Sequence, residues 1–346
     1  MEEGERVMRW FGSLALAFAI CGSACAQEKL ESQSEIIETA QLPNALEFPA
    51  RATKTPSDKK PTEGDDQAYE LDTSMLLGSS LDKALNSRKP INYISCQGVP
   101  EQGGAVLCQT SPKAKVKISR GGKDFYYENA NEAGKIIVGF DRDEDKAQIA
   151  VGDKSVEYFF TPRDYDTSRI DGLPPSQVST FTAAQLKRIR SSSARKKVGF
   201  SSRAKSMGFK DGFDLPIKAD FIKTTNFGAQ RILNGEPKKP HYGVDLAAPV
   251  GTPIYAPADG VVSLADDDLY FEGAMVLLDH GQGLISMYLH TDEIMVEPGQ
   301  AVKQGEQIAT VGSKGRSTGP HLCWRLKWRN RNLDPLLLTE WPNDEH

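Results

Sequence analysis

The stretch that decides the fold of this chain runs from Gly319 to Trp328 and reads GPHLCWRLKW. Apolar and polar side chains alternate along it with a period of two, as in a β-strand buried on one face. The apolar face is predicted to be core and consists of Leu322, Trp324, Leu326 and Trp328. The opposite face is polar and consists of His321, Cys323, Arg325 and Lys327. An imidazole and a thiol therefore stand side by side at the start of the strand.

Short strands separated by glycine and proline surround this stretch throughout residues 221–340. We expect a compact antiparallel β domain there, because no βαβ pattern occurs. Alternation in the strand from Leu284 to His290 puts Ser286, Tyr288 and His290 on one face, which we expect to line the same cleft as His321. The other expected strands are Pro253 to Tyr255, Gly260 to Leu264, Ala274 to Asp279 and Gln307 to Val311.

Residues 91–163 also show short alternating runs, with turns at Gly121-Gly122 and Gly152-Asp153. About six or seven strands at this spacing predict a small β-sandwich of immunoglobulin-like type, with a spacer or targeting role. Its nearby cysteines, Cys96 and Cys108, can bridge two strands in an oxidising compartment. The fold class is thus mainly β, with a small N-terminal β-sandwich followed by a C-terminal antiparallel β domain.

A connector at residues 164–220 links the two β regions. It carries a helix predicted from Thr182 to about Lys197 with a run of basic residues, of which a solvated face is the usual meaning and contact with an anionic wall the alternative.

The N-terminus has the features of an export signal. An apolar run from Trp10 to Ile20 precedes Ala24-Cys25-Ala26, so residues 1–26 are expected to be a signal peptide, with lipidation at a cysteine as the alternative to soluble export. Residues 27–90 are polar and proline-rich and are predicted to be a disordered tether. No transmembrane segment is expected after signal cleavage, and we expect a periplasmic or cell-envelope location.

Composition excludes one class of partner. The chain has 346 residues, of which 39% are hydrophobic and 26% charged, as in ordinary globular proteins. Its formal net charge of -5 provides no broad basic surface, so a nucleic-acid partner is not expected. Oligomeric state cannot be read from the sequence.

Four of the five histidines, His241, His280, His290 and His321, lie in the β domain expected at residues 221–340. His241 and Asp245 are four residues apart, and the neighbouring proline and glycine indicate a loop that runs into a strand. A catalytic zinc ion uses three protein ligands and one open position, and His241, Asp245 and Cys323 can supply the three. His290 and His321 then remain as general base or acid and as groups that stabilise the oxyanion.

Several motifs in this region together resemble the lysostaphin/LytM family of peptidoglycan metallopeptidases. They are Phe227-Gly228, Gln230-Arg231, Asn234-Gly235, His241 to Asp245, Ala247-Ala248-Pro249, Gly251-Thr252-Pro253, Tyr288-Leu289-His290 and Gly319-Pro320-His321-Leu322. The resemblance implies a zinc metalloendopeptidase, with zinc at His241 and Asp245, catalytic roles for His290 and His321, and a third ligand two residues after His321. It also implies a zinc-bound water as nucleophile and peptidoglycan stem peptides as the substrate.

The chain departs from this family at the third ligand, where His-x-His becomes His321-Leu322-Cys323. A thiolate can bind zinc, but together with Asp245 it would neutralise the ion and reduce its Lewis acidity. The sequence therefore predicts a slower enzyme. The alternative is a degenerate protein that binds cell wall and regulates other hydrolases.

Three further interpretations concern single side chains. His280 lies in a hairpin turn and is expected to be structural. Cys323 could instead be an inert apolar filler, or a thiol nucleophile activated by His321. Arg325 and Lys327 are expected to make surface contacts rather than bind substrate.

Overall fold

The computed structural model describes residues 92–121, 124–174, 178 and 180–341. The chain divides into two units, Met1–Thr73 and Ser74–His346, and all described residues belong to the second. The predicted signal peptide at 1–26 and the predicted tether at 27–90 lie outside the described residues.

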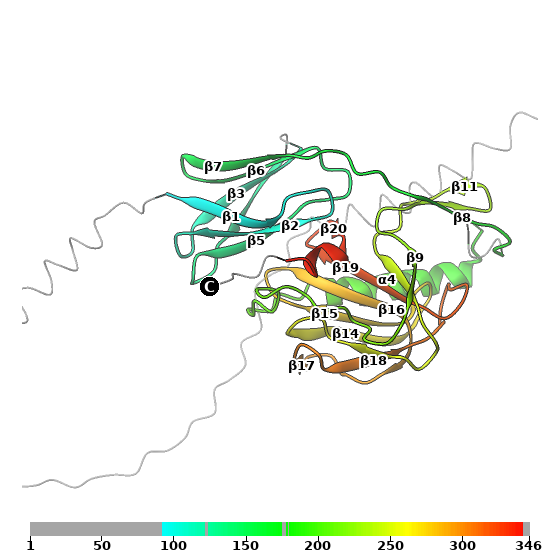
Figure 1. Ribbon diagram of the computed structural model, residues 1–346. Helices are drawn as coiled ribbons and strands as arrows, with labels where there is room; N and C mark the ends of the chain where they lie inside the picture. The colour runs from blue at the N-terminus through cyan, green and yellow to red at the C-terminus, as the bar shows by residue number, and fades with distance from the viewer. Residues whose placement is uncertain (1–91, 122–123, 175–177, 179, 342–346) are drawn as a thin grey trace, which may run out of the picture. The chain divides into compact units, whose positions relative to one another are not determined.

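Two small antiparallel sheets form the N-terminal part of the described chain, as expected (Figure 1). One has the order β1-β2-β5, with bounds Ile94–Val99, Ala105–Thr110 and Lys135–Gly139. The other has the order β4-β3-β6-β7, with bounds Asp124–Asn129, Lys115–Arg120, Lys146–Val151 and Lys154–Phe159. Their apolar faces share one hydrophobic core. Cys96 lies opposite Cys108 on the neighbouring strand and forms a disulfide with it.

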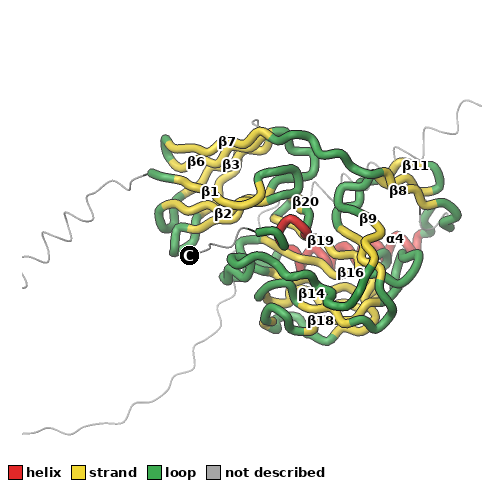
Figure 2. The backbone as a smooth tube through the Cα atoms, in the orientation of Figure 1, coloured by secondary structure: helices red, strands yellow, loops and turns green. Residues whose placement is uncertain are grey.

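A long antiparallel sheet forms the C-terminal part, with the order β17-β14-β15-β16-β19-β12-β9 (Figure 2). In chain order the strands of this path are β9 (Ile222–Thr225), β12 (Val244–Ala247), β14 (Gly260–Leu269), β15 (Gly273–Asp279), β16 (Leu284–Ile294), β17 (Ala301–Val302) and β19 (Leu322–Trp328). Strands β13 (Pro253–Tyr255), β18 (Gln307–Val311) and β20 (Arg331–Leu333) pair outside it, and a 3₁₀ helix, η2 (Pro335–Leu338), follows.

The segment between β9 and β12 contains an exception to the antiparallel expectation. Strand β10 (Gln230–Leu233) pairs in parallel with β8 (Thr167–Ile170) of the connector and antiparallel with β11 (Glu236–Pro237). Residues that precede His241 are thereby joined to the connector.

Helix α4 (Ala183–Phe200) lies where the connector helix was predicted. Thr182 caps it, accepting a hydrogen bond from the Gln185 backbone while the Gln185 side chain bonds back to the Thr182 backbone. The helix packs on β14 (Figure 1). Its basic run is not simply a solvated face. Three of its cations pair with acidic residues of the β14–β15 hairpin, namely Arg188 with Asp268, Arg195 with Asp266 and Lys196 with Glu272.

The two faces of the C-terminal sheet belong to two hydrophobic clusters. Trp324 and Tyr288 lie in the main core, which is shared with the N-terminal sheets. Cys323 and Leu289, which are paired across β19 and β16, lie in a second cluster on the reverse face. The expectation that Ser286 and Tyr288 line the cleft is therefore wrong, because both point into the main core. The Ser286 hydroxyl lies within hydrogen-bonding distance of His280 Nε2 and of the Tyr288 hydroxyl.

Within the described part of the chain, none of the helices combines the length and apolar character that a membrane crossing requires.

Candidate metal centre

Three possible metal ligands meet at one end of strands β12 and β19. Asp245 on β12 lies directly opposite Cys323 on β19, because the two strands pair in antiparallel register. His241 precedes β12 in a loop that is fixed by two backbone hydrogen bonds, from Gly228 to the His241 carbonyl and from His241 to the Ala229 carbonyl. Residues far apart in sequence are thereby brought together by strand pairing.

The distances between these ligands fit a single metal ion. His241 Nε2 lies 3.1 Å from Asp245 Oδ1 and 3.2 Å from Cys323 Sγ, and the three ligand atoms all lie within 4.8 Å of one another. Bonds of about 2.0 to 2.3 Å in a tetrahedral site would hold such atoms about 3.3 to 3.6 Å apart. Asp245 Oδ1 is buried, and its close contact with His241 Nε2 lacks good hydrogen-bond geometry, so a cation between the two atoms would satisfy both.

The charge state of the three groups also suits a cation. Burial lowers the pKa of His241 to about 4, so its imidazole is neutral near pH 7. Although burial alone would raise the pKa of Asp245, its contact with His241 holds that pKa well below the usual range. Burial raises the pKa of Cys323 to about 12, so a cation must replace the thiol proton before the sulfur can serve as a thiolate ligand.

His290 reaches the site through a β-bulge. Strand β15 pairs Ala274 with Thr291 but Met275 with Leu289, so His290 is the extra residue, and its φ is 63°. The bulge interrupts the alternation and turns the imidazole away from the core face. The structure brings His290 beside His321, but the strand face that sequence reasoning assigned to His290 was wrong.

The hydrogen bonds of the two free histidines fix their tautomers. His290 Nδ1 lies 2.8 Å from the Lys314 carbonyl and His321 Nδ1 lies 2.8 Å from the Gly319 carbonyl, so each Nδ1 donates a hydrogen. Each Nε2 then keeps its lone pair. The ring centres are 4.9 Å apart, and His321 Nε2 lies 3.8 Å from Asp245 Oδ1. Burial, and then the charge of His321, lowers the pKa of His290 to about 4.

Arg325 is a neighbour that sequence reasoning assigned to the surface. Its Nε donates a hydrogen bond to Cys323 Sγ at 3.2 Å. The alternation of β19 had placed Cys323 and Arg325 on one face. This was the sequence signal that could have identified Arg325 as a neighbour of the centre. A second arginine, Arg231 on β10, has a buried Nε without a hydrogen bond, and its charge acts on Cys323 and Asp245. Two guanidinium groups therefore lie near the carboxylate of Asp245 and the sulfur of Cys323.

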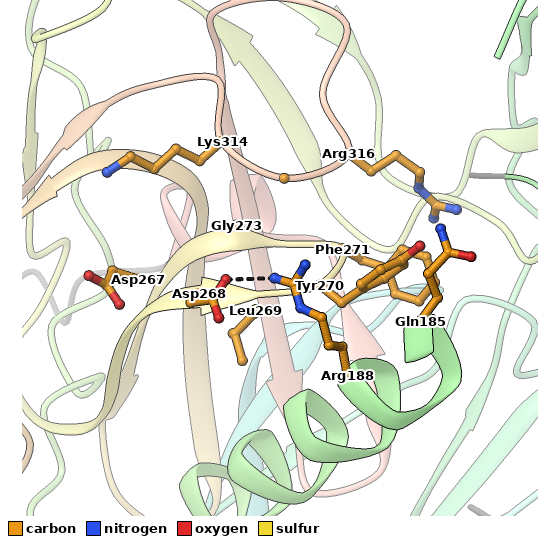
Figure 3. Close-up of a pocket in the computed structure, with 11 residues that line it drawn as sticks. Gln185, Arg188, Asp267, Asp268, Leu269, Tyr270, Phe271, Gly273, Lys314 and Arg316 are labelled. Carbon is orange, nitrogen blue, oxygen red and sulfur yellow. Dashed lines mark hydrogen bonds and ion pairs between the residues drawn. The ribbon is translucent and has the colours of Figure 1, made fainter. Parts of the chain in front are cut away.

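An open pocket of about 490 Å³ lies between α4 and the turn that joins β14 to β15 (Figure 3). Lys314 and Arg316 approach it from a loop, while Tyr270 lies near the ion pair of Arg188 with Asp268. The carbonyl of Lys314 also holds His290, so the pocket and the centre share one loop.

His280 is removed from this centre, as expected. It is fully buried, its Nδ1 donates to the Asp259 carbonyl, and its Nε2 accepts from the Ser286 hydroxyl. Both ring nitrogens are therefore used within the core.

Comparison with known proteins identifies the region that contains the centre. The model of the family described as Peptidase family M23 matches residues 239–335. Peptidoglycan DD-endopeptidase ShyA of Vibrio cholerae is 37% identical over 123 residues, which are 35% of this chain and 28% of that protein. Peptidoglycan DD-endopeptidase ShyC of Vibrio cholerae is 44% identical over 105 residues, covering 30% of this chain and 24% of that protein. The chain thus matches only about a quarter of the length of these curated relatives.

A crystal structure from Pseudomonas aeruginosa, described as a peptidase M23, extends the match beyond this region. It superimposes with a TM-score of 0.51 at 25% identity and covers 70% of this chain and 96% of that chain. The likeness therefore includes part of the chain that precedes residue 239.

Proposed function

Because this chain belongs to peptidase family M23 through residues 239–335, we propose that it is a zinc metalloendopeptidase that hydrolyses peptide cross-links of bacterial peptidoglycan. The observation that carries the proposal is the meeting of His241, Asp245 and Cys323 beside two histidines with free Nε2 atoms. The relatives ShyA and ShyC, both named peptidoglycan DD-endopeptidases, support the substrate class.

In this proposal His241, Asp245 and Cys323 hold the zinc. When bound, zinc would act as a Lewis acid that lowers the pKa of water and polarises a peptide carbonyl. His290 is kept in one tautomer by the Lys314 carbonyl, so its Nε2 can accept a proton from the attacking water. His321, held in the same way by Gly319, can hydrogen-bond the developing oxyanion or protonate the leaving amine.

We also propose an envelope location for the protein. The export signal predicted at residues 1–26 agrees with the proposed wall substrate, and the Cys96–Cys108 disulfide is typical of an oxidising compartment. The sandwich at 91–163 and the connector at 164–220 would then accompany the peptidase domain at 221–340 outside the cytoplasm.

The test of the main proposal is the digestion of purified sacculi by the zinc-loaded, signal-processed protein. We expect close to one zinc ion per chain and conversion of cross-linked muropeptides to monomers, detected by mass spectrometry. Asp245→Ala should lose both zinc and activity, whereas His290→Ala should keep zinc and lose activity by about 100-fold or more. A zinc-loaded protein that leaves several types of sacculus intact would refute the proposal.

The alternative function, a non-catalytic regulator that binds cell wall, is favoured by one observation, the thiol at position 323. Substitution Cys323→His separates the two. If only the histidine variant digests sacculi, the natural protein is the regulator. If the natural protein digests them and Cys323→Ala does not, the thiolate is a working ligand.

A further inference from the structure

We propose that Arg325 is a positioning residue that offsets the charge of the Cys323 thiolate, and that Cys323 and Arg325 act as one unit at the metal. The inference rests on the proposed metal centre, but it does not depend on the identity of the substrate. It assigns a function to Arg325, a side chain that is not itself a candidate metal ligand.

The contact between the two side chains is direct. Arg325 Nε lies 3.2 Å from Cys323 Sγ, and both residues project from the same face of β19. Across β16 their partners are Leu289 and Met287, neither of which offers a polar atom that could compete for the guanidinium. The sulfur is fully buried, so water cannot replace the hydrogen bond from Arg325.

Gly243 leaves the room that Arg325 occupies. A Cβ at this position would lie 2.4 Å from Arg325 Cγ and 2.6 Å from the Trp324 carbonyl oxygen. Gly243 stands midway between His241 and Asp245, so the loop that supplies two ligands also makes space for the stem of the arginine. This glycine is needed for close approach and not for its backbone angles, because its φ is outside the left-handed region.

The charge balance at the metal explains what the contact between Arg325 and Cys323 contributes. A divalent ion held by Asp245 and a Cys323 thiolate has no net charge left, whereas an imidazole in place of the thiolate would leave one positive charge. The guanidinium groups of Arg325 and Arg231 both add positive charge beside the ion, and Arg325 also draws electron density from the sulfur through its hydrogen bond. A hydrogen-bonded thiolate donates less charge to the metal, and the metal remains the stronger Lewis acid.

The first experiment measures the sulfur itself in the cobalt-substituted full chain. Its thiolate-to-cobalt charge-transfer band should move to longer wavelength in Arg325→Gln, because the sulfur lone pairs lose the hydrogen bond that lowers their energy. Arg325→Lys, which keeps the charge, should move the band less. Lys327→Gln is the matched control on the same face of β19 and should leave the band in place, and Cys323→His should abolish it. Circular dichroism of each variant shows whether the fold is retained.

A double-mutant cycle with sacculi links the pair to activity. Arg325→Gln should reduce kcat by about 10- to 100-fold when residue 323 is cysteine, and much less when it is histidine. A purely structural arginine would cost the same with either residue. The proposal is overturned if the charge-transfer band has the same position in Arg325→Gln and Lys327→Gln, or if cobalt gives no thiolate band at all. These readouts remain decisive even if the protein proves inactive on sacculi.

Discussion

At the scale of single residues, the centre depends on an unusual backbone angle. His290 has a φ of 63°, in a region where residues other than glycine are strained, and the bulge at Ala274 and Met275 imposes it. The strained conformation directs the imidazole toward His321 and places Nδ1 against the Lys314 carbonyl. The strained φ of His290 and the position of its imidazole are therefore both consequences of the bulge.

This strain can be measured by comparing glycine with alanine at two positions. His290→Gly should be more stable than His290→Ala by about 1 kcal/mol, because only alanine retains the left-handed cost. At His321, where φ is not positive, glycine should be the less stable by about 0.5 to 1 kcal/mol. Urea unfolding of the four variants gives both differences. If glycine is less stable than alanine at position 290 as well as at position 321, the bulge is not strained.

Residue patterns predicted part of this centre and missed part for physical reasons. Alternation correctly separated Trp324 from Cys323, since β19 is regular throughout its length. It failed at His290, because a bulge depends on the pairing of two strands and is not encoded in the periodicity of one. Arg325 was assigned to the surface because a single strand does not reveal how deeply its polar face is covered.

At the scale of elements, β15 and β16 enclose a second buried histidine. His280 follows β15 and is hydrogen-bonded by Asp259 and Ser286, and burial lowers its pKa to about 4. The hairpin therefore holds an imidazole that must stay neutral. Sequence position alone indicated the turn, but not this buried network.

The His280 network makes stability depend on pH. The unfolded chain binds a proton near pH 6.5 and the folded chain only near pH 4, so stability is lost as the pH falls between these values, at up to about 1.4 kcal/mol per pH unit. We expect His280→Gln to be less stable at pH 7 but to show a shallower loss between pH 6.5 and 4. Urea midpoints across this range measure the slope, and parallel slopes would contradict the assignment.

At the scale of the whole described unit, the N-terminal sheets and the C-terminal sheet share a buried ion pair. Arg331 on β20 contacts Glu144, which lies between β5 and β6, and the two residues are 1% and 4% exposed. Arg163 likewise pairs with Asp334. Neither link could be read from the sequence, because each joins residues more than 170 positions apart.

Breaking the buried pair should cost far more than breaking an exposed one. Arg331→Met leaves the buried Glu144 carboxylate without its arginine, with the Asp141 backbone N–H still donating to it, and should destabilise the fold by about 3 to 5 kcal/mol. Adding Glu144→Gln should recover much of that loss. Arg188→Ala, which removes the exposed pair with Asp268, should cost at most about 1 kcal/mol. Denaturant unfolding of these variants tests the ranking, and similar losses for Arg331→Met and Arg188→Ala would contradict it.

Oxidation must join Cys96 to Cys108 and must leave Cys323 out of any disulfide. Cys96 and Cys108 must give up two protons and two electrons to an external oxidant to form their disulfide, while Cys323 must remain unoxidised. Because Cys323 is completely enclosed once the C-terminal sheet has formed, folding itself protects it from the wrong partner. Preparations made by slow reoxidation of unfolded chains should therefore contain scrambled isomers, and supplying the metal before the oxidant should suppress them.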